Sequence, residues 1–169
     1  EFVSLLNQVR PGLIRVDADE MTYVLHIIIR FELEQEIIAG RLEVENIPAA
    51  WNAKYEEYLG IIPDSDANGC LQDVHWSSGI FGYFPTYALG SMMSAQIYYA
   101  MREDITDMDD LIARGEFSKI GDWLKERIHV HGRRYPTLKL IERACGNSFS
   151  SDYFVRYLRE KFGKFYDLE

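Results

Sequence analysis

The chain has 169 residues, about the size of one ordinary domain, of which 47% are hydrophobic, 27% charged and 14% aromatic. This composition is typical of a packed globular protein and excludes an intrinsically disordered chain. The chain has 27 Asp and Glu and 18 Lys and Arg, so its formal net charge is −9. A nucleic-acid-binding surface needs the opposite sign of charge. The two cysteines, Cys70 and Cys145, cannot make a disulfide framework, so we expect a reducing, cytoplasmic setting.

Neither a membrane span nor a secretory signal is expected. The longest strongly apolar stretch, 23–31, contains His26 and Arg30 and is far shorter than the roughly 20 residues that cross a bilayer. A basic segment followed by an apolar core, the mark of a secretory signal, is not found near the start. The chain begins at Glu1 rather than Met, within a helical apolar pattern over residues 2–9, which predicts a start inside a helix.

Apolar residues recur at the i, i+3, i+4 spacing of helices almost everywhere, which predicts a single all-α domain over residues 1–169. A long helix is expected to begin after Asp17, which acts as N-cap with Glu20 three residues on, and to stop at Gly40. Residues 24–33 of this helix are apolar on nearly every side. This pattern predicts a buried, central helix.

Shorter helices are expected around one irregular stretch. A helix should begin near Pro48 and end at Gly60, and a loop rich in turn-forming residues should follow over 63–69. Residues 70–84 show neither helical nor strand periodicity, and helical spacing resumes at Pro85. The later helices are expected over about 108–113, 120–128, 137–144 and 152–162, the last with Ser150 or Ser151 as its cap.

The four histidines do not have the spacing of a zinc hydrolase. A His-Glu-x-x-His helix, which presents two ring nitrogens on one face, is absent from the sequence. His129 and His131 would point in opposite directions on a helix, although an extended turn would let them converge. We expect them to interact with carbonyl groups at a helix end, and we assign no metal site to this chain.

The run over residues 69–87 has the residue types of a reaction site. It combines glycines, a histidine near a carboxylate, and phenols, in the order Asp73, His75, Tyr83 and Tyr87. Groups of this kind can donate hydrogen bonds to a developing oxyanion. The alternative is a buried aromatic loop in which Asp73 and Gln72 satisfy backbone groups.

Arg15 is a second candidate, just before the start of the long helix. A pairing with Asp17 or Asp19 would contribute little to stability if it were exposed. Alternatively, the fork of the guanidinium grips a substrate carboxylate through two parallel hydrogen bonds.

Two motifs carry a resemblance to a known family. Residues 14–19, Ile-Arg-Val-Asp-Ala-Asp, match an Ile-Arg-x-x-Ala-Asp motif, and residues 69–76, Gly-Cys-Leu-Gln-Asp-Val-His-Trp, match Gly-x-x-Gln-Asp-x-His-Trp. Both are motifs of the carboxypeptidase Taq metallopeptidases, which this chain resembles. The likeness also covers residues 20–34, 78–87 and the regions of His131-Gly132 and Tyr157-Leu158, and so essentially the whole chain.

The resemblance implies an all-α, zincin-like (neurolysin-like) peptidase that removes single amino acids from peptide C-termini, with zinc or another divalent metal as cofactor. In that family a His-Glu-x-x-His helix, a downstream Glu and an Asp-x-Arg-x-Thr motif precede Ile-Arg-x-x-Ala-Asp, and this sequence contains none of them. The chain is therefore expected to be the C-terminal portion of a longer carboxypeptidase, inactive alone and binding no metal itself. Peptides are its expected partners through their C-terminal carboxylate, and the family implies a homodimer.

Roles for individual residues follow from the resemblance. Arg15 matches the family arginine expected to pair with the free C-terminal carboxylate of the peptide. His75 and Tyr83 are predicted as catalytic donors to the oxyanion, by analogy with a His and Tyr pair in distant zincins. Asp73 is expected either to orient His75 or to bond the loop backbone, and Tyr87 to line the same pocket one helical turn beyond Tyr83.

Expected roles also follow for two further polar residues. Gln72 belongs to the predicted substrate-binding set, although more as a brace of the loop than as a direct contact. His26 lies on the buried helix and is expected to be a core histidine.

A rival hypothesis from another class is a non-catalytic helical interaction or dimerisation module derived from the same fold. It is favoured by the missing metal-binding motifs. The reading frame upstream of Glu1 distinguishes the two hypotheses. A His-Glu-x-x-His sequence there would support the enzyme, and a start codon at or just before Glu1 would support the module.

Overall fold

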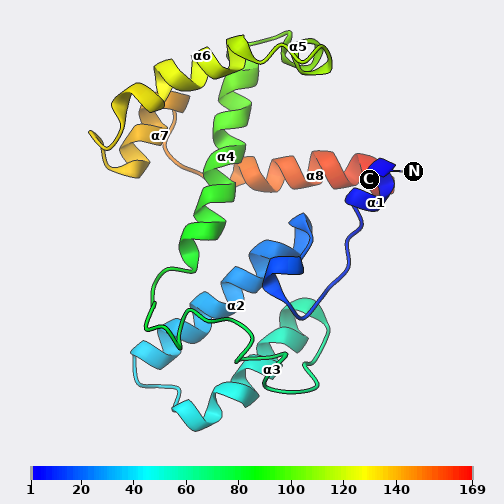
Figure 1. Ribbon diagram of the computed structural model, residues 1–169, viewed down its shortest axis with the longest axis vertical. Helices are drawn as coiled ribbons and strands as arrows, with labels where there is room; N and C mark the ends of the chain where they lie inside the picture. The colour runs from blue at the N-terminus through cyan, green and yellow to red at the C-terminus, as the bar shows by residue number, and fades with distance from the viewer. Residues whose placement is uncertain (1, 169) are drawn as a thin grey trace. The chain divides into compact units, whose positions relative to one another are not determined.

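Helices and short 3-10 turns form the regular structure of the chain in the computed structural model, which describes residues 2–168 (Figure 1). Within this range there is no β-strand, and no helix combines the length and the apolar character needed to cross a membrane. The all-α fold expected from the sequence is confirmed. The chain divides into two compact units, Glu1–Ala88 and Leu89–Glu169, and the single domain expected over both stays a prediction.

The helices follow the predicted order closely. The first unit contains α1 (Phe2–Leu6), the 3-10 turn η1 (Arg15–Asp17), α2 (Glu20–Ile38), the 3-10 turn η2 (Val44–Asn46) and α3 (Ile47–Leu59). Helix α4 (Pro85–Asp104) begins in the first unit and continues into the second, followed there by α5 (Met108–Ala113), α6 (Ser118–Arg127), η3 (His129–His131), α7 (Thr137–Cys145) and α8 (Asp152–Tyr166). The predicted bounds of α5 are confirmed, and those of the other helices differ by a few residues.

Helix α2 has Asp19 rather than Asp17 as its N-cap, so the predicted cap is wrong. The Oδ1 atom of Asp19 accepts hydrogen bonds from the backbone N–H groups of Met21 and Thr22, both at 2.9 Å. These bonds satisfy donors that have no partner within the helix. Asp17 instead lies in η1, where its backbone N–H donates to the carbonyl of Ile14 at 3.1 Å. The chain therefore makes one further turn before the helix starts.

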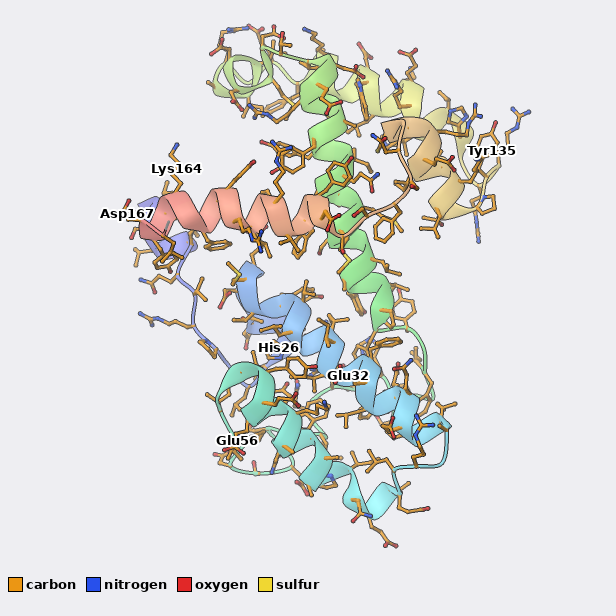
Figure 2. The ribbon with its side chains drawn as sticks, turned by 180° about the vertical axis from the view of Figure 1, so that it is seen from behind. His26, Glu32, Glu56, Tyr135, Lys164 and Asp167 are labelled. Atoms are coloured by element: carbon orange, nitrogen blue, oxygen red, sulfur yellow. The ribbon has the colours of Figure 1, made fainter. Side chains whose placement is uncertain are left out.

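The core of the first unit lies between α2 and α3, which pack side by side (Figure 1). The cluster of buried side chains comprises Ile29, Leu33, Trp51, Tyr55 and Leu59. The predicted burial of residues 24–33 is confirmed for most positions, since Phe31 alone among them is exposed, at 40%. At the edge of this layer Glu32, labelled in Figure 2, accepts a hydrogen bond from the Tyr58 hydroxyl at 2.8 Å.

The segment between α3 and α4 is irregular, as predicted, and backbone turns hold its first part. The N–H groups of Gly69 and Leu71 both donate to the carbonyl of Asp66, at 3.1 and 2.9 Å. A Cβ atom at position 69 would lie 3.1 Å from the carbonyl oxygen of Ser65, so this close approach favours glycine. The tight turn leads directly into residues 70–76, which carry most of the predicted site.

The second unit has its own apolar core between α4, α5 and α6. Its buried members are Met101, Ile105, Met108, Leu111 and Trp123. Of the two predicted caps of α8, Ser151 holds the N-cap position without a side-chain cap bond, and the Ser150 hydroxyl accepts from the N–H of Asp152 at 3.1 Å. Helix α8 continues past its predicted end at Phe162, which is buried, to Tyr166, whose ring stacks on that of Phe162.

The two aspartates before α2 give a matched test of this fold. Asp19→Ala removes the cap and is expected to lower the free energy of unfolding by about 1 kcal/mol. Asp17→Ala changes an exposed residue that caps nothing and is expected to stay within about 0.5 kcal/mol of the parent chain. Urea unfolding followed by circular dichroism measures both values. A larger loss for Asp17→Ala than for Asp19→Ala would contradict the observed cap.

Candidate functional site

Arg15 and Asp73 form a buried ion pair that joins the two motifs of the sequence. The Nε–H of Arg15 donates to Oδ2 of Asp73 at 2.7 Å, and the two side chains are 9% and 8% exposed. Arg15 is carried by η1, and Asp73 by the irregular segment that follows Gly69. Of the two roles predicted for Arg15, pairing with Asp17 or Asp19 is wrong, because its carboxylate partner lies 58 positions away.

The carboxylate of Asp73 has three side-chain partners. Besides Arg15, the Nε–H of Arg30 donates to Oδ2 at 3.1 Å, and Nδ1 of His75 lies 2.6 Å from Oδ1. Burial alone would raise the pKa of Asp73. The hydrogen bonds from Arg15 and His75, together with the charges of Arg30 and Arg15, outweigh burial and lower this pKa to about 2. Asp73 is therefore a carboxylate anion at neutral pH.

His75 is oriented on both of its nitrogens. Because ionised Asp73 can only accept, Nδ1 of His75 carries the proton of their hydrogen bond. In the neutral ring, Nε2 is then an acceptor, and it lies 3.1 Å from the hydroxyl of Tyr87. The rings of Phe84 and Tyr83 lie next to the imidazole, with centroids 4.3 and 6.0 Å away. Of the two roles expected for Asp73, this geometry favours the orientation of His75.

Arg15 also contacts three aromatic side chains. Its Nη1 lies 3.4 Å from the hydroxyl of Tyr23, and the guanidinium carbon lies 5.0 Å from the ring centre of Tyr87 and 5.7 Å from that of Phe84. Burial alone would lower the pKa of Arg15. The hydrogen bond and the charge of Asp73 outweigh burial, so the pKa is raised. A permanent cation is thus held against aromatic rings.

Arg30 and His26 lie deeper, in the interior between α2 and α3, and both have no exposed surface. The Tyr55 hydroxyl donates to the carbonyl of Leu13 at 3.1 Å and accepts from Nη1 of Arg30 at 3.3 Å, so the 3.1 Å contact to Nδ1 of His26 is a donation from the ring. Desolvation, with the charges of Arg30 and Arg15, lowers the pKa of His26 to about 4. The expected core histidine is confirmed, and Figure 2 labels it on α2.

Helix α2 also holds the far part of the loop through Glu34. This buried carboxylate accepts from the indole N–H of Trp76 at 2.8 Å and from the backbone N–H of Gly82 at 3.2 Å. Gly82 has a φ of 75°, the left-handed region that favours glycine. Arg30 and Glu34, one helical turn apart, therefore fix the loop to the same helix at two places.

Most of the residues predicted for the site lie together. Beyond the contacts of His75, the rings of Tyr83 and Tyr87 meet edge to face with centroids 5.4 Å apart. Tyr83 is 48% exposed, so its side chain is open to solvent. Gln72 is half-buried and lies beside Tyr55. This position agrees with a loop brace and leaves a role in substrate binding as a prediction.

Sequence reasoning did not find Arg30 or the phenols of Tyr23 and Tyr55 around this cluster. One signal was present for Arg30: it is a charged residue inside the apolar run of 24–33. A charge on a fully buried helix requires a partner, so this position indicates an internal carboxylate. The identity of that carboxylate depends on the tertiary fold.

The described residues do not fit a metal ion. Among residues 2–168 no three His, Cys, Asp or Glu side chains gather as a metal-binding set. The ring nitrogens of His75 already face Asp73 and Tyr87, and His26 is sealed in the core. No chemical step is therefore assigned to a metal held by these residues.

A family model described as carboxypeptidase Taq (M32) metallopeptidase matches residues 1–162, a range that includes both motifs and every residue of the cluster. The chain belongs to this family. Carboxypeptidase 1 of Bacillus subtilis (strain 168) is 49% identical over 166 residues, covering 98% of this chain and 33% of the relative. Thermostable carboxypeptidase 1 of Thermus thermophilus is 43% identical over 166 residues, covering 98% and 32%.

Solved structures of carboxypeptidases share the fold of this chain. An M32 carboxypeptidase from Deinococcus radiodurans R1 superposes with a TM-score of 0.93 at 45% identity, covering 96% of this chain and 33% of that one. Metallocarboxypeptidase 1 of Trypanosoma cruzi gives a TM-score of 0.91 at 41% identity, covering 94% and 34%. The chain thus spans about a third of the length of these relatives.

The interior of the cluster predicts a specific pH dependence at His26. Its folded-state pKa of about 4 lies below the unfolded value near 6.5, so the neutral ring stabilises the fold fully above about pH 6.5. As the pH falls from about 6.5 to about 4, this contribution of about 3 kcal/mol is lost. Nitrogen-15 NMR of the histidine rings measures the midpoint directly, and His26→Gln removes the effect. A His26 midpoint near 6.5 would contradict the buried geometry.

Proposed function

We propose that this chain forms the substrate-recognising part of a metallocarboxypeptidase that releases amino acids from the C-termini of peptides. The observation that carries the proposal is the arrangement of Arg15 and His75 on opposite oxygens of one buried carboxylate, Asp73. Asp73 therefore fixes the distance between Arg15, which can bind the terminal carboxylate of a peptide, and His75, which can act at the scissile bond. The carboxypeptidases that match this chain at 43–49% identity support the same activity.

Arg15 binds the terminal carboxylate of the peptide in this proposal. Its Nε–H is committed to Asp73, so the incoming carboxylate meets the end of the guanidinium that carries Nη1 and Nη2. Two parallel hydrogen bonds from that edge match the geometry of a carboxylate. A C-terminal amide presents no negative charge to this edge, and this difference selects chain ends.

His75 and Tyr83 stabilise the oxyanion that develops on the scissile carbonyl. In the neutral ring Nε2 accepts from Tyr87, so the donor to the oxyanion in this proposal is the form of His75 that carries protons on both nitrogens, with Nδ1–H on Asp73 and Nε2–H toward the oxyanion. Tyr83, exposed and beside His75, supplies a phenolic O–H, and Tyr87, whose ring meets that of Tyr83 edge to face, borders the substrate in this proposal.

The zinc or other divalent metal of the complete enzyme is assigned to residues outside those described, since residues 2–168 offer no fitting donor set. Such an ion supplies an activated water when it is bound. The 169-residue chain alone is accordingly proposed neither to hydrolyse peptides nor to bind zinc tightly. Chelator-sensitive cleavage of an N-blocked dipeptide by this chain would overturn that part of the proposal.

A non-catalytic interaction or dimerisation module is the second candidate, and one observation favours it. The apolar side chains of α1 are all strongly exposed, at 62–72%, as in an element that pairs with another surface; they are Phe2, Val3, Leu5 and Leu6. Homodimer formation and a cytoplasmic location belong with the proposal in either case. Gel filtration of the chain tests the dimer.

Arg15→Ala in an active enzyme that contains this segment tests the proposed function. Loss of a charge-assisted bidentate contact of roughly 1.5–3 kcal/mol should raise KM for peptides with a free C-terminus by about 10-fold to 100-fold. Peptides with a C-terminal amide, which cannot use this contact, should stay about equally poor substrates. Steady-state kinetics on matched acid and amide peptides gives the ratio.

Tyr83→Phe in the same assay tests the second proposed donor to the oxyanion. It deletes one exposed hydroxyl and should lower kcat by roughly 100-fold or more, with KM nearly kept, as expected for an oxyanion donor. An equal effect of Arg15→Ala on acid and amide peptides would assign Arg15 to structure, and an unchanged kcat would remove Tyr83 from the mechanism.

A further inference from the structure

Arg30 is a second arginine on the site carboxylate, and neither motif of the family contains it. Its guanidinium is fully buried and donates to the same Asp73 oxygen as Arg15. We propose that Arg30 is a positioning residue that fixes Asp73, and through it His75, while a peptide carboxylate occupies Arg15. This inference rests on the proposed function and adds a residue to it.

The contacts of Arg30 hold its guanidinium in one place. Nη1 donates to the backbone carbonyl of His26 at 2.9 Å and to the hydroxyl of Tyr55 at 3.3 Å. The guanidinium carbon lies 4.6 Å from the ring centre of Trp51 and 5.5 Å from that of Phe84. A cation enclosed on all these sides cannot turn toward solvent, so its bond to Asp73 is preorganised.

The difference in burial separates the tasks of the two arginines. Arg15 keeps 9% of its side chain exposed and Arg30 keeps none, so an incoming peptide can reach Arg15 alone. The peptide carboxylate then shares Arg15 with Asp73, binding the Nη1 and Nη2 end of a guanidinium whose Nε–H stays on Asp73. Arg30 stays bonded to Asp73 throughout, so the Asp73 carboxylate keeps its position against Nδ1 of His75.

Charge balance leads to the same conclusion. A peptide carboxylate and Asp73 together carry two negative charges, and Arg15 alone would leave one of them uncompensated in a largely buried site. Arg30 supplies the second positive charge. Without the peptide the three ionised side chains sum to one positive charge, which favours the entry of an anion.

Glu34 is a matched control that separates a purely structural role of Arg30 from a positioning role. Both residues lie on α2, both are buried, and both fix the same loop, but Glu34 bonds Trp76 and Gly82 rather than Asp73. If Arg30 only anchored the loop, loss of either residue would disturb His75 alike. If Arg30 acts through Asp73, only its own loss reaches the imidazole.

The first experiment follows the Nδ1–H signal of His75 by NMR in the histidine-labelled 169-residue chain, without any need for activity. Arg30→Met keeps the side-chain length without the donors and should make this proton exchange with solvent about tenfold faster or more, the change for one lost charge-assisted hydrogen bond. Arg30→Lys should give a smaller change, and Glu34→Gln should leave the signal as in the parent chain. Parent-like exchange in Arg30→Met, or an equal change in Glu34→Gln, would overturn the proposal.

A second experiment uses the unaltered chain, so it holds even if Arg30→Met does not fold. N-acetylglycine is titrated while the Nε–H signals of Arg15 and Arg30 are followed, with N-acetylglycinamide as the uncharged control. The acid should move the Arg15 signal and leave that of Arg30 in place. Equal movement of both signals would overturn the role of Arg30. An acid that moves neither would count against Arg15 and the proposed function, while the exchange test of His75 would still decide the role of Arg30.

Discussion

The carboxylate of Asp73 lies at the meeting point of three parts of the first unit. It accepts from Arg15 in the turn before α2, from Arg30 within α2, and from His75 two positions further along its own loop. A carboxylate that is 8% exposed costs free energy unless such partners compensate for its lost hydration. Two guanidinium groups and an imidazole provide that compensation and fix the orientation of everything they touch.

Helix α2 supplies the rigid frame for this arrangement. The loop over 70–84 has no regular secondary structure, so its geometry depends on bonds to neighbouring elements. Arg30 and Glu34 provide two of these from one face of a helix that is itself held by the stacked rings of Trp51 and Tyr55. Side chains on a well-packed helix keep their positions better than side chains on a loop.

Helical spacing and the two family motifs predicted the fold class and most residues of the cluster around Asp73. The helical spacing predicted the all-α fold, and the apolar run over 24–33 predicted the buried helix; the structure confirms both. The N-cap of α2 was misplaced because Asp17 and Asp19 are both good caps, and only the extra 3-10 turn decides between them. Local sequence therefore sets where helices form more firmly than where they begin.

The partners of the charged residues were harder to predict. The motifs named Arg15 and Asp73 separately, but the bond between them spans 58 positions and is a property of the tertiary fold. Arg30 was visible as a charge in an apolar run, yet nothing local indicated that its partner was the carboxylate next to His75. A buried charge in a predicted core helix is a signal that identifies such a site before its partner is known.

Titration of Asp73 itself tests this account most directly. Carbon-13 NMR of the labelled carboxylate should give a midpoint of about pH 2, well below the ordinary value of about 3.9, because Arg15, Arg30 and His75 stabilise the anion. Since the folded-state pKa is the lower one, this stabilisation is complete above about pH 4 and is lost as the pH falls toward 2. A midpoint at or above the ordinary value would show that the three partners do not hold Asp73, and would contradict the site as described.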